Sequence, residues 1–208
     1  MSQAQIVKVV PTEEYFSINW QLEIRCNYDC MYCSPKWHDN HSRPHSLETM
    51  QIAWKNIFAK TQHLNIPYKI AFTGGELTAN KNFLPFLQWL KQHYHQHLFA
   101  LLLTTNGSAT YKYYRKMFEL VDNITFSVHS EHINEQKFFD MVIKLKQTVS
   151  NSKFIHVSIM DEFWNQQRIP MYTKLLDQHC ISYNVKEINY SVATREQPIF
   201  LGKLNLAV

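Results

Sequence analysis

Residues 18–33 read INWQLEIRCNYDCMYC, an alternating apolar and polar stretch that runs directly into three cysteines. The first half, residues 18–25, has the side-chain period of two that is typical of a β-strand with unlike faces. Cys26, Cys30 and Cys33 then follow with the spacing C-x3-C-x2-C. Thiolates this close together can hold one metal centre from a single loop, so the sequence predicts a strand that leads into a metal-binding loop.

Five more stretches of the chain have a strand-like pattern, and segments with apolar residues at helical spacing separate them. The 174 residues from 17 to 190 give six strand–helix units an average of 29 residues each. That is the size of parallel strands joined by helical crossovers. The predicted strands are Ile18–Arg25, Tyr68–Thr73, Ala100–Thr105, Asn123–His129, Lys153–Met160 and Ser182–Tyr190.

Several of these strands have one apolar and one polar face. In residues 123–129, for example, Ile124 and Phe126 fall on one face, and Ser127 and His129 on the other. A flat doubly wound sheet would be apolar on both faces, because helices cover both. We therefore predict an α/β fold of another kind, a partial (β/α)6 TIM-like barrel with a polar lining and its chemistry at the carboxyl ends of the strands.

Composition sets the class of protein. With 45% hydrophobic and 18% charged residues, a disordered chain is excluded. We expect one domain over residues 1–208, with the cluster loop at 26–33 and a short C-terminal tail at 191–208. The longest apolar run, residues 98–103, is too short to cross a membrane. Residues 1–10 show no secretory signal.

The charge and the cysteines indicate partners and compartment. A net charge of +4 permits an anionic substrate, whereas a nucleic-acid partner is not expected. Clustered cysteines without a secretory signal are typical of a metal site in a reducing compartment, so we expect a cytoplasmic protein.

Glycines mark two further loops. The chain has only four glycines, yet Gly74 and Gly75 are adjacent in the stretch Thr73–Glu76, called here the GGE loop, which ends the second predicted strand. The stretch 104–107, TTNG, ends the third strand. Paired glycines in a chain that otherwise avoids them indicate backbone freedom or a close approach.

The cysteine spacing alone leaves three kinds of protein open. A cubane iron–sulfur cluster on three cysteines keeps one iron free for an exogenous ligand. A closed Cys3His zinc site in a binding domain would take His38 or His41 as its fourth ligand. An electron-carrying cluster protein would also fit the cysteines, but it leaves the GGE loop unexplained.

Together, the three loops resemble those of the radical SAM superfamily. The cluster loop matches C-x3-C-x-Φ-C with Tyr32 as the aromatic residue, and the GGE loop and the Thr-Asn-Gly at 105–107 are also similar to family motifs. The resemblance implies that Cys26, Cys30 and Cys33 hold a [4Fe–4S] cluster. Its unique iron would bind the amino and carboxylate groups of S-adenosylmethionine.

The remaining cofactor contacts follow from the same resemblance. Reductive cleavage of the cofactor would give methionine and a 5′-deoxyadenosyl radical that abstracts a substrate hydrogen. Gly74, Gly75 and Glu76 would meet the methionine amino group, and the backbone beside Tyr32 would lie against adenine. Ribose or the carboxylate would be contacted by Asn106 and Ser127.

The sequence departs from the family pattern at two places. Leu77 follows the GGE loop where proline is common, and His129 stands where the family often has Asp. His129 could hold a ribose hydroxyl, move a proton, or be a hydrogen-bonded interior histidine.

The remaining expectations concern residues outside these motifs. We expect Cys180 in the core. Candidates to face the nucleoside of the cofactor are Glu187, Asn189 and Tyr190. The residues after the cluster loop could shield the cluster or bind an anionic substrate, or they could form a solvated loop; they are Trp37, His38, His41, Arg43 and His45.

The resemblance also implies partners. We expect a small-molecule or peptide substrate and an external electron donor of flavodoxin or ferredoxin type. An activating enzyme that makes a glycyl radical on a partner protein is the alternative within the family.

Overall fold

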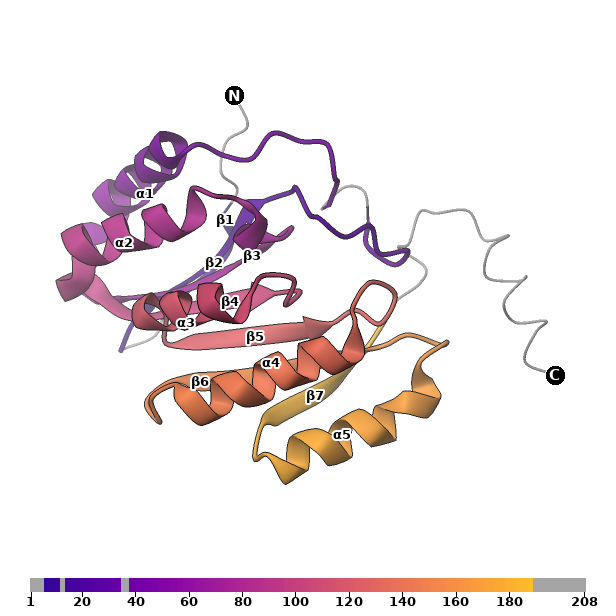
Figure 1. Ribbon diagram of the computed structural model, residues 1–208. Coiled ribbons are helices and arrows are strands. Elements are labelled where there is room, and N and C mark those ends of the chain that lie inside the picture. Colours follow the sequence, from indigo (N-terminus) through magenta and orange to yellow (C-terminus); the bar gives the residue numbers. More distant parts are fainter. Residues whose placement is uncertain (1–5, 12–13, 35–37, 189–208) are drawn as a thin grey trace.

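The computed structural model describes the backbone of residues 6–11 and all atoms of residues 14–34 and 38–188. Its strands form one open sheet in the order β1-β2-β3-β4-β5-β6-β7 (Figure 1). The strands are β1 (Ile6–Pro11), β2 (Phe16–Glu23), β3 (Tyr68–Gly74), β4 (Leu98–Thr105), β5 (Asn123–Val128), β6 (Phe154–Asp161) and β7 (Ser182–Glu187). The α-helices are α1 (Leu47–Thr61), α2 (Phe83–Tyr94), α3 (Tyr111–Leu120), α4 (Glu135–Thr148) and α5 (Ile169–Gln178). Short 3-10 helices cover Gln62–Leu64, Leu77–Ala79, His95–His97 and Gln166–Arg168.

Strands β2 to β7 are parallel, and each pairs with the next one along the chain. Right-handed crossovers between consecutive neighbours place every helix on the same face of the sheet, as Figure 1 shows. A doubly wound sheet would reverse its strand order and carry helices on both faces. The prediction of a partial (β/α)6 TIM-like barrel is therefore confirmed, with the barrel left open.

Strand β1 was not predicted. It pairs antiparallel with β2 and adds a seventh strand at the edge of the sheet. The last parallel strand is shorter than the predicted Ser182–Tyr190, since β7 ends at Glu187. The predicted residues 189 and 190 and the tail 191–208 lie outside the described residues.

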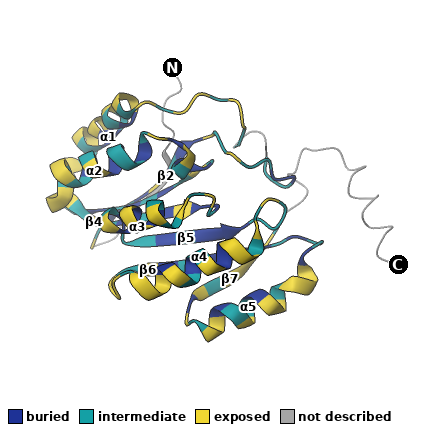
Figure 2. Ribbon diagram, in the orientation of Figure 1, coloured by how far each residue is buried: buried dark blue, intermediate teal, exposed yellow. Residues whose placement is uncertain are grey.

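The core lies between the sheet and the helices. Trp20 of β2 and Trp54 of α1 are buried, and their rings stack with centroids 6.3 Å apart. Figure 2 shows buried residues along the strands and on the sides of the helices that face them. Side-chain caps start three helices, because Ser46, Thr110 and Asn134 each accept a bond from a backbone N–H of the first turn.

The prediction of a buried Cys180 is wrong. Helix α5 ends at Gln178, and Cys180 adopts the left-handed region with φ of 51° and is exposed. Helical spacing from Leu176 therefore stops before this residue, and Ile181 enters the core instead, with 3% of its surface exposed.

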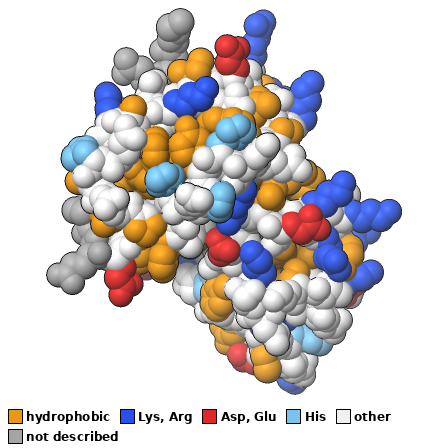
Figure 3. Space-filling view, turned by 90° about the vertical axis from the view of Figure 1, so that its left-hand side faces the viewer, with side chains coloured by type: hydrophobic (Ala, Val, Ile, Leu, Met, Phe, Trp, Pro, Cys, Tyr) orange, Lys and Arg blue, Asp and Glu red, His pale blue; other side chains and the backbone are white. Residues whose placement is uncertain are grey.

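The two ends of the parallel strands differ in character. Figure 3 turns the end where these strands begin toward the viewer, and hydrophobic and histidine side chains gather in its upper half. The cysteines and glycines of the predicted site follow the opposite, carboxyl ends.

In the described part of the chain, every helix is too short or too polar to cross a membrane.

Candidate active site

A cavity of about 420 Å³ opens at the carboxyl ends of the parallel strands. Its wall includes the three thiols of the cluster loop and residues from the ends of β3, β4, β5 and β7. The residues that the sequence analysis assigned to the cluster and the cofactor line this cavity: Cys26, Cys30, Tyr32, Cys33, Gly74, Gly75, Glu76, Asn106, Ser127 and His129. Of the further candidates, His38 and Glu187 line it, His41, Arg43 and His45 do not, and Trp37, Asn189 and Tyr190 lie outside the described residues.

The cluster loop is closed at its base by backbone pairing. The Cys26 N–H donates to the Asp39 carbonyl at 2.7 Å, and the Asp39 N–H donates to the Ile24 carbonyl at 3.1 Å. The Arg25 guanidinium donates to the Ser42 carbonyl at 2.8 Å. These contacts bring the chain after the three cysteines back to the end of β2, so the thiols project from a compact loop.

The glycine pair packs against the start of the cluster loop. A Cβ at Gly75 would lie 2.0 Å from the Arg25 carbonyl oxygen, and one at Gly74 would lie 2.1 Å from that of Glu23. The Gly75 N–H donates to Glu23 at 2.8 Å, and the Glu76 N–H donates to Arg25 at 2.9 Å. The close approach that the sequence predicted at these glycines is thus one of backbone to backbone, and it fixes the GGE loop beside the cysteines.

Glu76 braces the loops that follow β3 and β4. Its buried Oε1 accepts from the Thr78 N–H at 3.0 Å and from the Thr105 hydroxyl at 2.8 Å. Its Oε2 accepts from the Asn106 N–H at 2.6 Å. Burial raises the pKa of Glu76, and these donors oppose the shift by stabilising the carboxylate.

Tyr32 and His129 form a pair in the cavity wall. The Tyr32 hydroxyl is hydrogen-bonded to His129 Nδ1, and the two rings stack with centroids 5.9 Å apart. Burial lowers the pKa of His129 to about 4. The imidazole is therefore neutral near pH 7, with Nδ1 engaged by the Tyr32 hydroxyl. Cys30 Sγ lies 3.6 Å from the same Nδ1.

Two of the three thiols are poorly ionised without a metal. Burial raises the pKa of Cys26 to about 11. The interaction between the neighbouring Cys30 and Cys33 thiols raises the pKa of Cys30 and lowers that of Cys33. A cationic metal centre would stabilise all three thiolates.

The three cysteine sulfur atoms are not placed as the ligands of one zinc ion would be. Zinc bonds of about 2.3 Å hold the sulfurs of a closed site within roughly 4 Å of one another. The three cysteine sulfurs are not all within 4.8 Å of each other; among the described residues, only Cys30, Glu131 and His132 form such a set. A cubane cluster instead takes each cysteine on a different iron.

The two histidines proposed for zinc are also engaged elsewhere. His38 Nε2 is hydrogen-bonded to the Tyr28 carbonyl at 2.5 Å. His41 is 83% exposed, with Nε2 3.8 Å from Asp39. Neither histidine therefore completes a Cys3His site in this structure, and three cysteines are the donor set that a cluster with one open iron takes.

Sequence reasoning missed Glu162, which has no exposed surface. It follows β6 directly, and its Oε2 accepts from the Ser130 N–H at 3.1 Å and from Asn165 Nδ2 at 3.2 Å. Its Oε1 has no partner among the described residues. Burial raises the pKa of Glu162 to about 7. The available signal was a carboxylate two positions after the predicted strand, which was expected to end at Met160.

Lys186 was missed too; it lines the cavity, and its charge helps to lower the pKa of Cys33.

We expect Glu162→Gln to change how stability depends on pH. An unfolded glutamate titrates near about 4.3, so between that pH and about 7 the folded state binds the extra proton. The stability contributed by this group is therefore present at low pH and lost as pH rises through that window. Between pH 5 and pH 8, the free energy of unfolding of wild type should therefore fall by on the order of 2 kcal/mol relative to that of the variant.

Urea unfolding at both pH values measures this difference. Glu119→Gln, at an exposed position of α3, is the control and should track wild type at both values. A difference between wild type and Glu162→Gln that is the same at pH 5 and pH 8 would contradict the prediction.

A three-cysteine loop and a glycine-rich loop meet at one cavity of a parallel partial barrel, which places a candidate metal centre at the strand ends where barrels of this kind carry their chemistry. The family model of the radical SAM superfamily matches residues 24–154, more than half of the chain. The chain therefore belongs to the radical SAM superfamily. No curated protein matches the sequence.

Solved structures with the same fold are remote in sequence. The crystal structure of Streptococcus suis SuiB is similar with a TM-score of 0.59 and 12% identity, covering 92% of this chain and 44% of SuiB. BtrN, in complex with AdoMet and 2-DOIA, is similar with a TM-score of 0.50 and 18% identity, covering 67% of this chain and 54% of BtrN. The chain thus spans about half the length of these proteins, and the likeness shows the fold.

Proposed function

We propose that this enzyme binds a [4Fe–4S] cluster through Cys26, Cys30 and Cys33 and acts on a small-molecule or peptide substrate. The bound cluster would supply one electron that cleaves S-adenosylmethionine to methionine and a 5′-deoxyadenosyl radical, which takes a hydrogen atom from the substrate. The observation that carries the proposal is that the three thiols share one cavity with the GGE loop.

The chain's own residues would bind and orient the cofactor. The Glu76 carboxylate, held by donors from two loops, would place negative charge near the methionine ammonium group. Asn106 would contact the ribose or the carboxylate; its Nδ2 lies 3.8 Å from Cys26 Sγ. Ser127, which is 5% exposed, would contribute a second polar group of this kind.

The adenine would lie near the pair formed by Tyr32 and His129. Their stacked rings give the wall an apolar surface, and His129 Nε2 would be the ring nitrogen available to the cofactor, because Nδ1 is occupied by the Tyr32 hydroxyl. AdoMet in the BtrN structure supports a site for the same cofactor in this fold.

The proposal includes a redox partner. An external flavodoxin or ferredoxin would deliver the electron in the cytoplasm, and oxygen would destroy the exposed cluster. Cys26, Cys30 and Cys33 are free thiols, which is compatible with a reducing compartment. We propose residues 1–208 as a single functional domain.

Electron paramagnetic resonance tests the proposal. We expect anaerobically reconstituted, dithionite-reduced protein to give a [4Fe–4S]⁺ signal that changes when S-adenosylmethionine is added, with release of 5′-deoxyadenosine. A signal that ignores S-adenosylmethionine would indicate an electron carrier. A protein that keeps zinc and assembles no cluster would overturn the proposal.

A further inference from the structure

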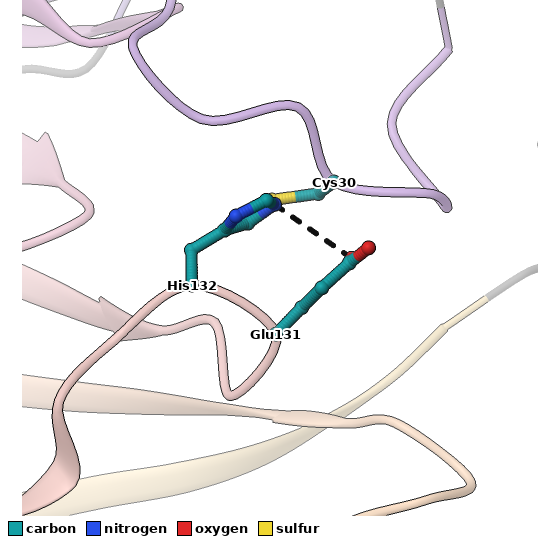
Figure 4. Close-up of side chains that lie close together, drawn as sticks. All are labelled: Cys30, Glu131 and His132. Atoms are coloured by element: carbon teal, nitrogen blue, oxygen red, sulfur yellow. Dashed lines mark ion pairs between the residues drawn. The ribbon is translucent and has the colours of Figure 1, made fainter.

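Two side chains outside the predicted site converge on one of the cysteines. Glu131 and His132, in the loop between β5 and α4, point toward Cys30 of the cluster loop (Figure 4). One ligand atom from each residue lies within 4.8 Å of the other two. Neither Glu131 nor His132 belongs to a motif of the sequence analysis, and neither has a role in the function proposed above.

Both side chains are held in place from the cluster-loop side. Glu131 Oε2 accepts from the Met31 N–H at 3.1 Å. The His132 ring stacks on Tyr28 with centroids 4.8 Å apart. His132 Nε2 lies 3.8 Å from Glu131 Oε2. The two candidate ligands are therefore ordered next to each other by contacts with the loop that carries Cys30.

We propose that Cys30, Glu131 and His132 bind a single divalent ion of the zinc class when the cluster is absent. Thiolate, imidazole and carboxylate are the ligands zinc uses, and three protein ligands leave a fourth position for water. Bonds of about 2.0–2.3 Å place neighbouring ligand atoms roughly 3.5 Å apart. The observed 3.8 Å between His132 and Glu131 needs only a small contraction.

The site would exclude the cluster. Cys30 cannot serve as a ligand of both centres, so an ion held by Glu131 and His132 would remove one of the three cysteines from cluster assembly. This part of the inference rests on the proposed function, whereas binding of the ion does not. The site would make cluster assembly sensitive to the supply of zinc.

Cobalt(II) titration of the reduced, cluster-free full chain tests the site, because cobalt follows zinc coordination and its thiolate complexes absorb light. We expect Glu131→Gln and His132→Ala each to weaken cobalt binding about tenfold or more. Cys26→Ala should leave it within about twofold, as should the control His41→Ala at an exposed histidine. Glu131→Gln keeps an acceptor for Met31, and circular dichroism checks that each variant is folded.

The opposite pattern would overturn the proposal. If Cys26→Ala and Cys33→Ala lose cobalt while Glu131→Gln and His132→Ala retain it, the ion sits in the cysteine loop alone. A second arm follows the absorbance of the cluster during reconstitution with one equivalent of zinc. Zinc should slow assembly in wild type and have no effect in His132→Ala; equal rates in both would also overturn the proposal.

The two arms separate this inference from the proposed function. If no cluster forms under any condition, the proposed function fails, but the cobalt arm still decides whether the three residues form a metal site. If the cluster forms and the cobalt arm fails, the proposed function stands without this site.

Discussion

Cys30→Ala is expected to give a folded protein that assembles no stable [4Fe–4S] cluster and releases 5′-deoxyadenosine only at the level of a protein-free control. Three cysteines on a four-iron cluster leave one iron without a protein ligand. Losing one cysteine leaves a second iron without its ligand. Only 3% of the surface of Cys30 is exposed. Because the change to alanine removes a single sulfur atom, it should cost little stability compared with its effect on the cluster.

Cys180→Ala is the matched control for this variant. Cys180 is also a free thiol, but it is exposed beyond the end of α5 and does not line the cavity. Iron content, the reduced-cluster signal and 5′-deoxyadenosine release should all equal those of wild type. Loss of iron in Cys180→Ala together with its retention in Cys30→Ala would contradict the assignment of the cluster ligands.

The order of the parallel strands was predictable from the sequence because two local properties determine it. Repeating units of about 29 residues match strands joined by helical crossovers, and polar inward faces exclude helices on both sides. Strand β1 pairs antiparallel with β2 at an edge, outside this repeat, so the same reasoning could not find it.

The candidate site was predictable where a motif lies in one loop or where a polar residue stands at the end of a predicted strand. The glycine pair was expected to allow a close approach, yet its partner, the Arg25 carbonyl, lies 50 residues earlier in the chain. Likewise, Glu131 meets Met31 across 100 residues, and no local pattern marks that contact. Cys180 was misplaced for the converse reason, since a periodic pattern does not reveal that a helix ends before its next turn.

Glu76→Gln is expected to weaken S-adenosylmethionine binding and to destabilise the protein. Each carboxylate oxygen accepts a backbone N–H, Oε1 from Thr78 and Oε2 from Asn106. A glutamine has only one oxygen, so one of these buried donors must face an amide N–H. Leaving a buried donor without a partner costs about 1–3 kcal/mol, and the negative charge that would attract the methionine ammonium group is also lost.

Thr105→Val separates the bracing role of Glu76 from its charge. It removes the hydroxyl that donates to Oε1 at 2.8 Å and leaves the carboxylate in place. Equilibrium dialysis with S-adenosylmethionine and thermal unfolding measure both variants after anaerobic reconstitution. If Glu76 contributes charge to the site, Glu76→Gln should lose about tenfold or more in affinity, and Thr105→Val should lose much less, even though both unfold at lower temperature. Equal losses of affinity in the two variants would leave Glu76 as a brace alone, and wild-type affinity in Glu76→Gln would remove it from the cofactor site.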